Sequence, residues 1–99
     1  MSDKKPKKPP VEEMKDDKGR LVMTVKVYSA FKSFFDEPAY SVSAVNHTGP
    51  FDILPKHHNF TTLISPCDLK ITAPSGDQTI PVGQALMHVK ASRVVIFLP

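Results

Sequence analysis

The residues with the greatest capacity for chemistry are one cysteine, Cys67, and four histidines, of which His57 and His58 are adjacent in the chain. Neighbouring side chains on an extended chain point to opposite faces, so an adjacent pair rarely holds one metal ion. Neither a second cysteine nor the spacing that zinc ligands usually have accompanies them. The sequence therefore predicts no metal site and no cofactor.

A nucleophilic cysteine needs a base and an orienting group beside it. Cys67 follows Pro66 and precedes a segment of alternating apolar and polar residues, which favours a half-buried structural cysteine. The glycines lie too far apart for a phosphate-binding loop, and aromatic residues do not interleave with basic ones as nucleic-acid binding requires. We therefore expect no catalytic residue and no nucleic-acid partner. A minor hydrolase that uses Cys67 and a histidine is the alternative, and loss of activity in Cys67→Ser would favour it.

The stretch GPFDILPKHHNF, residues 49–60, has two interpretations. Its two prolines limit the backbone on both sides of FDIL. The segment can be a turn that packs Phe51, Ile53 and Phe60 into the core. It can also be a rigid surface for a partner, because a rigid loop loses little entropy on binding. The residues alone favour the first interpretation.

Short strands must position these residues. Apolar and polar residues alternate with a period of two, and turn residues interrupt the runs about every 8–12 residues, which indicates a β-sandwich or barrel. We predict an all-β fold, a small sandwich or flattened barrel of about 8–10 short strands. Pro81 places its strand at an edge or at a bulge, because proline cannot donate to the ladder. The predicted strands are 21–28, 39–45, 68–72, 78–82, 85–90 and 93–98, with 59–64 as a strand or a bent connection and turns at 35–38, 46–50, 64–67 and 73–77.

The chain has 99 residues and a net charge of +3, which suits one small domain. Residues 1–20 are rich in charge and proline and poor in apolar side chains, so we predict a disordered charged tail there and a folded domain over 21–99. The tail can solubilise the protein or bind an anionic surface. One cysteine, no apolar segment behind the N-terminal lysines and no apolar run of about 20 residues suggest an intracellular protein that does not enter a membrane.

Two segments resemble the bacterial-type epsilon subunit of rotary ATP synthases. VNHTGPFDILPKHHNFTTLISPCDLKI, residues 45–71, and VGQALMHVKASRVVIFL, residues 82–98, are similar to its motifs, and the opening from residue 21 resembles its first strands. The resemblance covers about residues 21–98. The positions that match the motifs are Gly49, Ile53, Pro55, His57, Pro66, Gly83, Val89, Val94 and Ile96.

The chain also departs from the family's pattern. The usual Pro-Gly-His is Pro55-Lys56-His57, and the usual double glycine is Gly83-Gln84. Lysine adopts positive φ with some strain, so the local turn is expected to differ. Most members continue into two C-terminal helices, and we expect a sandwich without this helical hairpin, because the sequence ends at Pro99. The roles of those helices in inhibition and ATP binding are therefore not carried over.

The resemblance implies a non-catalytic central-stalk, or rotor, subunit of a proton-translocating ATP synthase. Such a subunit clamps the gamma subunit to the c ring and helps transmit torque between ion flow and ATP synthesis or hydrolysis. It is peripheral, on the cytoplasmic face of the cell membrane, and it needs no cofactor. The alternative is a small sandwich adaptor whose basic tail binds an anionic surface. The residues expected to face the c ring are Asn46, His47, Thr48, Gly49, Pro50, Phe51, Asp52 and His57, and those expected to face gamma are Val82, Gly83, Gln84 and Ala85.

Overall fold

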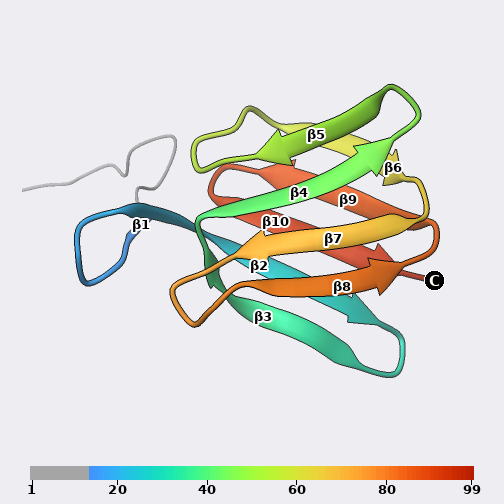
Figure 1. Ribbon diagram of the computed structural model, residues 1–99. Helices are drawn as coiled ribbons and strands as arrows, with labels where there is room; N and C mark the ends of the chain where they lie inside the picture. Colours follow the sequence, from blue (N-terminus) through green and yellow to red (C-terminus); the bar gives the residue numbers. More distant parts are fainter. Residues whose placement is uncertain (1–13) are drawn as a thin grey trace, which may run out of the picture.

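The computed structural model describes residues 14–99, which form two β-sheets packed face to face (Figure 1). No helix is present among these residues, so no helix of this part of the chain can cross a membrane. The all-β sandwich predicted from the alternation is therefore confirmed. Its strands are β1 (Met14–Lys15), β2 (Leu21–Ser29), β3 (Ser33–Ala39), β4 (Ser41–Asn46), β5 (Gly49–Ile53), β6 (Phe60–Ile64), β7 (Cys67–Thr72), β8 (Gln78–Val82), β9 (Ala85–Lys90) and β10 (Arg93–Leu98).

The larger sheet has six strands in the order β1-β2-β10-β9-β6, with β3 also paired to β2. Strands β2 and β10 are parallel, with Val25 opposite Val94, and the other pairs in this sheet are antiparallel. The smaller sheet has the order β5-β4-β7-β8 and is antiparallel throughout. Residues 59–64, for which the sequence left two possibilities, contain strand β6.

The core lies between the sheets and follows directly from the alternation of side chains. In β9, Met87 and Val89 are fully buried while the intervening His88 is exposed. In β4, Val42 is fully buried against the same cluster. Successive side chains of a strand point to opposite faces, so each strand contributes every second residue to the core. The buried apolar side chains of both sheets form one cluster.

Among residues 14–99, three prolines lie inside strands, and all three strands are at sheet edges. Pro81 is in β8, at the edge of the smaller sheet, as the sequence predicted. Pro50 is in β5, at the opposite edge of that sheet. Pro38 lies in β3 opposite Thr24 of β2, where the sequence predicted a turn at 35–38. Among the described strands β3 pairs with β2 alone, so the missing N–H of Pro38 interrupts no second ladder.

Connections between strands gather at two ends of the sandwich (Figure 1). We call one the hairpin end, on the right in Figure 1, and the other the clasp end, on the left. The hairpin end holds the segments 30–32, 47–48, 65–66 and 83–84. The clasp end holds the segments 16–20, 54–59, 73–77 and 91–92.

Ordered structure begins before Leu21, where the sequence placed the domain boundary. Strand β1 pairs with the start of β2, with Lys15 opposite Leu21. The turn between them is held by Asp16, whose Oδ1 accepts hydrogen bonds from the backbone N–H groups of Lys18 and Arg20, both at 2.9 Å. The composition of residues 1–20 does not reveal that the Asp16 carboxylate accepts these hydrogen bonds. The sequence therefore predicted a disordered tail over all twenty residues. Residues 1–13 lie outside the described residues, and the tail stays a prediction for them.

Candidate partner-binding surfaces

The turn between β4 and β5 presents His47 and Thr48 at the hairpin end. Asn46 and Gly49 pair with each other at its base, and Gly49 has a φ of 119°, a conformation that glycine adopts without strain. Asn46 Oδ1 accepts hydrogen bonds from the Thr48 backbone N–H at 2.9 Å and from the Thr48 hydroxyl at 2.7 Å. Asn46 Nδ2 donates to Thr62 Oγ1 of the other sheet at 3.1 Å. The buried Asn46 thus fixes the turn, and the two residues at its tip are exposed.

Strand β5 alternates between core packing and exposed polar groups. Ile53 is fully buried, and the half-buried Phe51 meets Phe60 edge to face with ring centroids 5.9 Å apart. Asp52 faces outward, where its Oδ1 accepts a hydrogen bond of 2.6 Å from the Ser43 hydroxyl of β4. The core-packing interpretation of residues 49–60 therefore describes Phe51, Ile53 and Phe60. Asp52 is exposed, and its Oδ1 carboxylate oxygen is bonded within the sheet.

His57 belongs to the loop between β5 and β6, at the clasp end. Its backbone N–H donates to the Leu54 carbonyl oxygen at 3.1 Å, and its ring stacks on His58 at 4.3 Å between centroids. Its Nδ1 lies 2.8 Å from the His58 carbonyl oxygen, which can only accept a hydrogen bond, so Nδ1 is the donor. Lys56, directly before His57, has a φ of 70°, so lysine itself adopts the positive φ that we expected it to avoid through a different local turn. His57 is half-buried and holds the loop together, whereas His58 is exposed.

The structure separates the residues that the sequence assigned to one c-ring surface. Residues 46–49 lie at the hairpin end, whereas His57 lies at the clasp end, and strand β5 runs between them (Figure 1). The segment assigned to gamma, by contrast, joins the first group. Cys67 pairs with Val82, so the turn at Gly83 and Gln84 lies at the hairpin end with the β4–β5 turn.

Exposure divides the residues assigned to gamma. Gly83 and Gln84 are exposed, Val82 is half-buried against the core and Ala85 is buried. A Cβ atom at Gly83 would meet no atom within 4 Å outside its chain neighbours. The space around this turn is therefore open, and nothing in the described chain requires a close backbone approach there.

Cys67 and His88 have structural surroundings. Cys67 is half-buried at the start of β7 and packs against the core, as the sequence predicted. His88 Nδ1 lies 2.9 Å from the hydroxyl oxygen of its cross-strand neighbour Thr61. Within residues 14–99, no three histidine, cysteine or acidic side chains gather to hold a metal ion.

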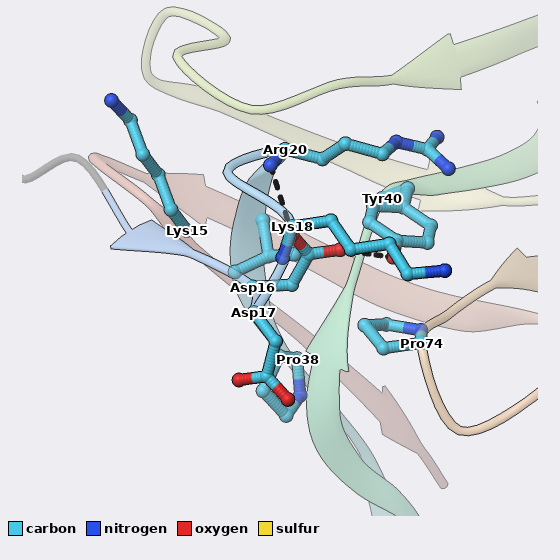
Figure 2. A pocket seen from close by; sticks show the side chains of 9 residues that line it. Lys15, Asp16, Asp17, Lys18, Arg20, Pro38, Tyr40 and Pro74 are labelled. Atoms are coloured by element: carbon cyan, nitrogen blue, oxygen red, sulfur yellow. Dashed lines mark hydrogen bonds between the residues drawn. The ribbon is translucent and has the colours of Figure 1, made fainter.

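A pocket of about 430 Å³ lies at the clasp end, beside the turn held by Asp16 (Figure 2). The Tyr40 hydroxyl donates a hydrogen bond to Asp16 Oδ2, and the Arg20 guanidinium lies over the Tyr40 ring, 3.7 Å from its centroid. The hydrogen bond from Tyr40 holds the pKa of Asp16 below its ordinary value. The same bond raises the pKa of Tyr40 above its ordinary value. These three residues, which we call the clasp, tie the β1–β2 turn to the start of β4.

One surface, on the outer face of the larger sheet, was not predicted from the sequence. Leu63 and Leu86 occupy strand positions where the alternation calls for polar residues, and they are 60% and 44% exposed. Leu63 pairs with Leu86 across β6 and β9, so the two form one apolar patch. The signal was present in the sequence as apolar residues at the exposed parity of 59–64 and 85–90. Only the strand register shows that they are neighbours.

Together, the fold and these surfaces define a small β-sandwich module with exposed turns at both of its ends. Residues 22–98 match the family described as ATP synthase, delta/epsilon chain, β-sandwich domain, and the chain belongs to this family. The resemblance to the ATP synthase epsilon subunit is thereby confirmed at the level of the delta/epsilon family. The delta/epsilon chain is a non-catalytic subunit of the ATP synthase, which agrees with the prediction that the chain has no catalytic site of its own.

Solved structures give the same fold at low sequence identity. A chain of the Euglena gracilis mitochondrial ATP synthase, in a structure of OSCP, F1 and the c ring, aligns with a TM-score of 0.72 and 15% identity over 88% of this chain and 57% of that one. A chain of the central stalk and c ring of the Tetrahymena thermophila mitochondrial ATP synthase aligns with a TM-score of 0.63 and 17% identity, over 76% and 61% of the two chains. This chain thus spans less than two thirds of the length of both. No curated protein sequence matches it.

Proposed function

We propose that this chain acts as the sandwich of a central-stalk rotor subunit, which holds the gamma subunit on the c ring of a proton-translocating ATP synthase. In this role it helps torque pass between ion flow and ATP synthesis or hydrolysis. The observation that carries the proposal is the family match over residues 22–98. We further propose the bacterial type, with the subunit bound through its complex at the cytoplasmic face of the cell membrane.

The stiffness of the sandwich supports this role, because an element that deforms would store torque instead of passing it on. One apolar cluster joins the two sheets, and interiors packed in this way have low compressibility. At the hairpin end one hydrogen bond also crosses between the sheets, and a second joins β4 to the connection between β6 and β7. Asn46 Nδ2 donates to Thr62 Oγ1, and the Ser65 backbone N–H donates to the Val45 carbonyl oxygen at 2.9 Å.

These bonds favour the hairpin end as the surface that meets the c ring. A force applied to His47 or Thr48 would reach both sheets through Asn46, which holds the turn from below. The exposed polar tip also suits contact with the polar loops of a membrane ring, since it offers hydroxyl and imidazole groups. The proposed gamma side, at Gly83 and Gln84, is exposed on the same end.

Reconstitution of the complex tests the proposal. The enzyme of the host organism is assembled with and without this chain, and ATP hydrolysis and ATP-driven proton pumping are measured on the same vesicles. We expect hydrolysis without the chain to pump few protons, and addition of the chain to restore pumping. Equal pumping per ATP in both preparations would contradict the proposed role.

A further inference from the structure

An apolar row crosses four strands on the outer face of the larger sheet. Leu63 of β6 pairs with Leu86 of β9, Leu86 pairs with Phe97 of β10, and Phe97 pairs with Tyr28 of β2. Residues that pair across strands share a face, so these four side chains lie side by side on the face away from the core. We call this row the outer stripe.

The outer stripe is too continuous to be a scatter of single surface residues. Leu63 and Leu86 are exposed, Tyr28 and Phe97 are half-buried, and the two rings meet edge to face at 5.3 Å between centroids. Isolated apolar residues on a surface need no explanation, whereas a contiguous apolar patch marks an interaction site. Neighbouring strands are about 4.8 Å apart, so the stripe is about 14 Å long.

Its geometry fits an α-helix that lies across the strands. Apolar residues at i, i+3, i+4 and i+7 of a helix recur about every 4.5–6 Å along its axis, close to the spacing between strands. About ten helical residues span the length of the stripe. A helix of this kind would cover Leu63 and Leu86 at one end and the Tyr28–Phe97 ring pair at the other.

Basic residues flank the stripe on the side of the clasp end. Each of three basic residues lies an even number of positions from a stripe residue of its own strand, so it points to the same outer face. They are Lys26 in β2, Lys90 in β9 and Arg93 in β10, and all three are exposed. Asp36, which pairs with Lys26, adds one carboxylate to this flank. The flank is therefore net positive, and it complements acidic residues along one edge of the occupying helix.

We propose that the outer stripe binds an amphipathic helix of the gamma subunit, with its apolar face on the stripe and an acidic edge against Lys26, Lys90 and Arg93. This inference rests on the proposed function. It follows from the continuity of surfaces as well as from charge, because Leu86 directly follows residues 82–85, which are proposed to face gamma. The outer stripe extends the proposed gamma contact from the turn at residues 82–85 to the outer face of the sheet. Gamma would then contact four strands.

Binding of the purified gamma subunit, measured by titration calorimetry, tests this inference. We expect the double variant Leu63→Ser/Leu86→Ser to lose at least about tenfold in affinity, because the helix would bury both exposed leucine side chains and serine forfeits that burial. Leu54→Ser is the matched control, since Leu54 is 55% exposed but lies in the loop at the clasp end. It should bind gamma as the wild type does. A thermal unfolding curve for each variant shows that it is folded.

Reversal of the charges beside the outer stripe gives a second test of the inference. Lys90→Glu/Arg93→Glu should weaken binding and reduce its dependence on salt, because the acidic edge of the helix then meets like charges. Unchanged affinity in the leucine double variant would overturn the inference and leave the proposed function standing. Failure of the wild type to bind gamma at all would contradict the proposed function itself. A wild type that forms dimers, with the double variant monomeric, would assign the stripe to a second copy and also overturn the inference.

Discussion

Thr48 and His57 lie at opposite ends of strand β5, although only eight residues separate them in the chain. The strand between Gly49 and Ile53 is about 14 Å long, so one rigid partner contact does not include both positions unless it runs along the whole strand. Thr48 is at the exposed tip of a turn, whereas the His57 ring is engaged with its neighbours His58 and Phe60.

This separation predicts different effects of substitutions at the two ends. His47→Ala/Thr48→Ala should weaken binding of the isolated c ring about tenfold or more, measured by capture of the detergent-solubilised ring on immobilised protein. His57→Ala should leave ring binding unchanged and lower thermal stability instead. Loss of ring binding in His57→Ala, with normal binding in the turn variant, would assign the c-ring surface to the clasp end.

Alanine substitutions at the neighbouring residues Ile53 and Leu54 should differ strongly in their effect on the free energy of unfolding. Ile53 is fully buried between the sheets, and its replacement by alanine leaves a cavity that costs about 2–5 kcal/mol of unfolding free energy. The neighbouring Leu54 is 55% exposed, and Leu54→Ala should change stability by less than about 0.5 kcal/mol. Urea unfolding measures both. Equal losses would show that the register of β5 is shifted by one residue.

The clasp predicts a stability that depends on pH at both extremes. The native pKa of Asp16 is lowered by its hydrogen bond from Tyr40, so this contribution is present above the ordinary carboxyl value and is lost as the pH falls through the native pKa. The native pKa of Tyr40 is raised by the same bond, so its contribution is present below the ordinary phenol value and is lost as the pH rises through the native pKa. The clasp is therefore complete between about pH 4 and pH 10.

Tyr40→Phe tests the clasp because it removes the hydroxyl and keeps the ring under Arg20. A titration of the Asp16 carboxyl by NMR should show its pKa rising toward the ordinary value in the variant. As the pH falls below about 4, the melting temperature of the variant should decrease less than that of the wild type. Identical Asp16 titrations in the two proteins would contradict the bond.

Lys56 predicts a measurable strain at the position where the family's pattern has glycine. Its φ of 70° costs an L-residue about 1–2 kcal/mol, which glycine does not pay. Lys56→Gly should therefore be more stable than Lys56→Ala by about 1 kcal/mol, after the greater freedom of glycine in the unfolded chain is included. Equal stabilities in chemical denaturation would mean that the loop relaxes out of the positive-φ conformation in the alanine variant.

Much of the fold could be predicted because alternation carries it. The parity of Met87 and Val89, or of Leu69 and Ile71, determines which face of each strand is buried. The prediction of a turn at 35–38 is wrong, because Pro38 lies inside β3, which is an edge strand. Proline is tolerated in edge strands, and which strands lie at an edge depends on tertiary pairing.

The candidate surfaces could be predicted only in part, since they depend on which strand ends meet in space. The sequence shows Asn46 and His57 within one short segment, but the antiparallel hairpin sends them to opposite ends. It also shows Leu63 and Leu86 as single exposed residues. Their pairing brings together residues more than twenty positions apart, which no local pattern reveals. The clasp was missed for the same reason, because Asp16 and Tyr40 meet only after folding.

Isolation of the tagged chain from membranes of its host, followed by quantification of the co-purifying subunits, tests the central claim most directly. A stalk subunit should bring down gamma and the c ring in a constant ratio with the catalytic subunits, and the assembly should resist washing at moderate salt. Recovery of the chain alone, or with partners that do not include gamma and the c ring, would contradict the account.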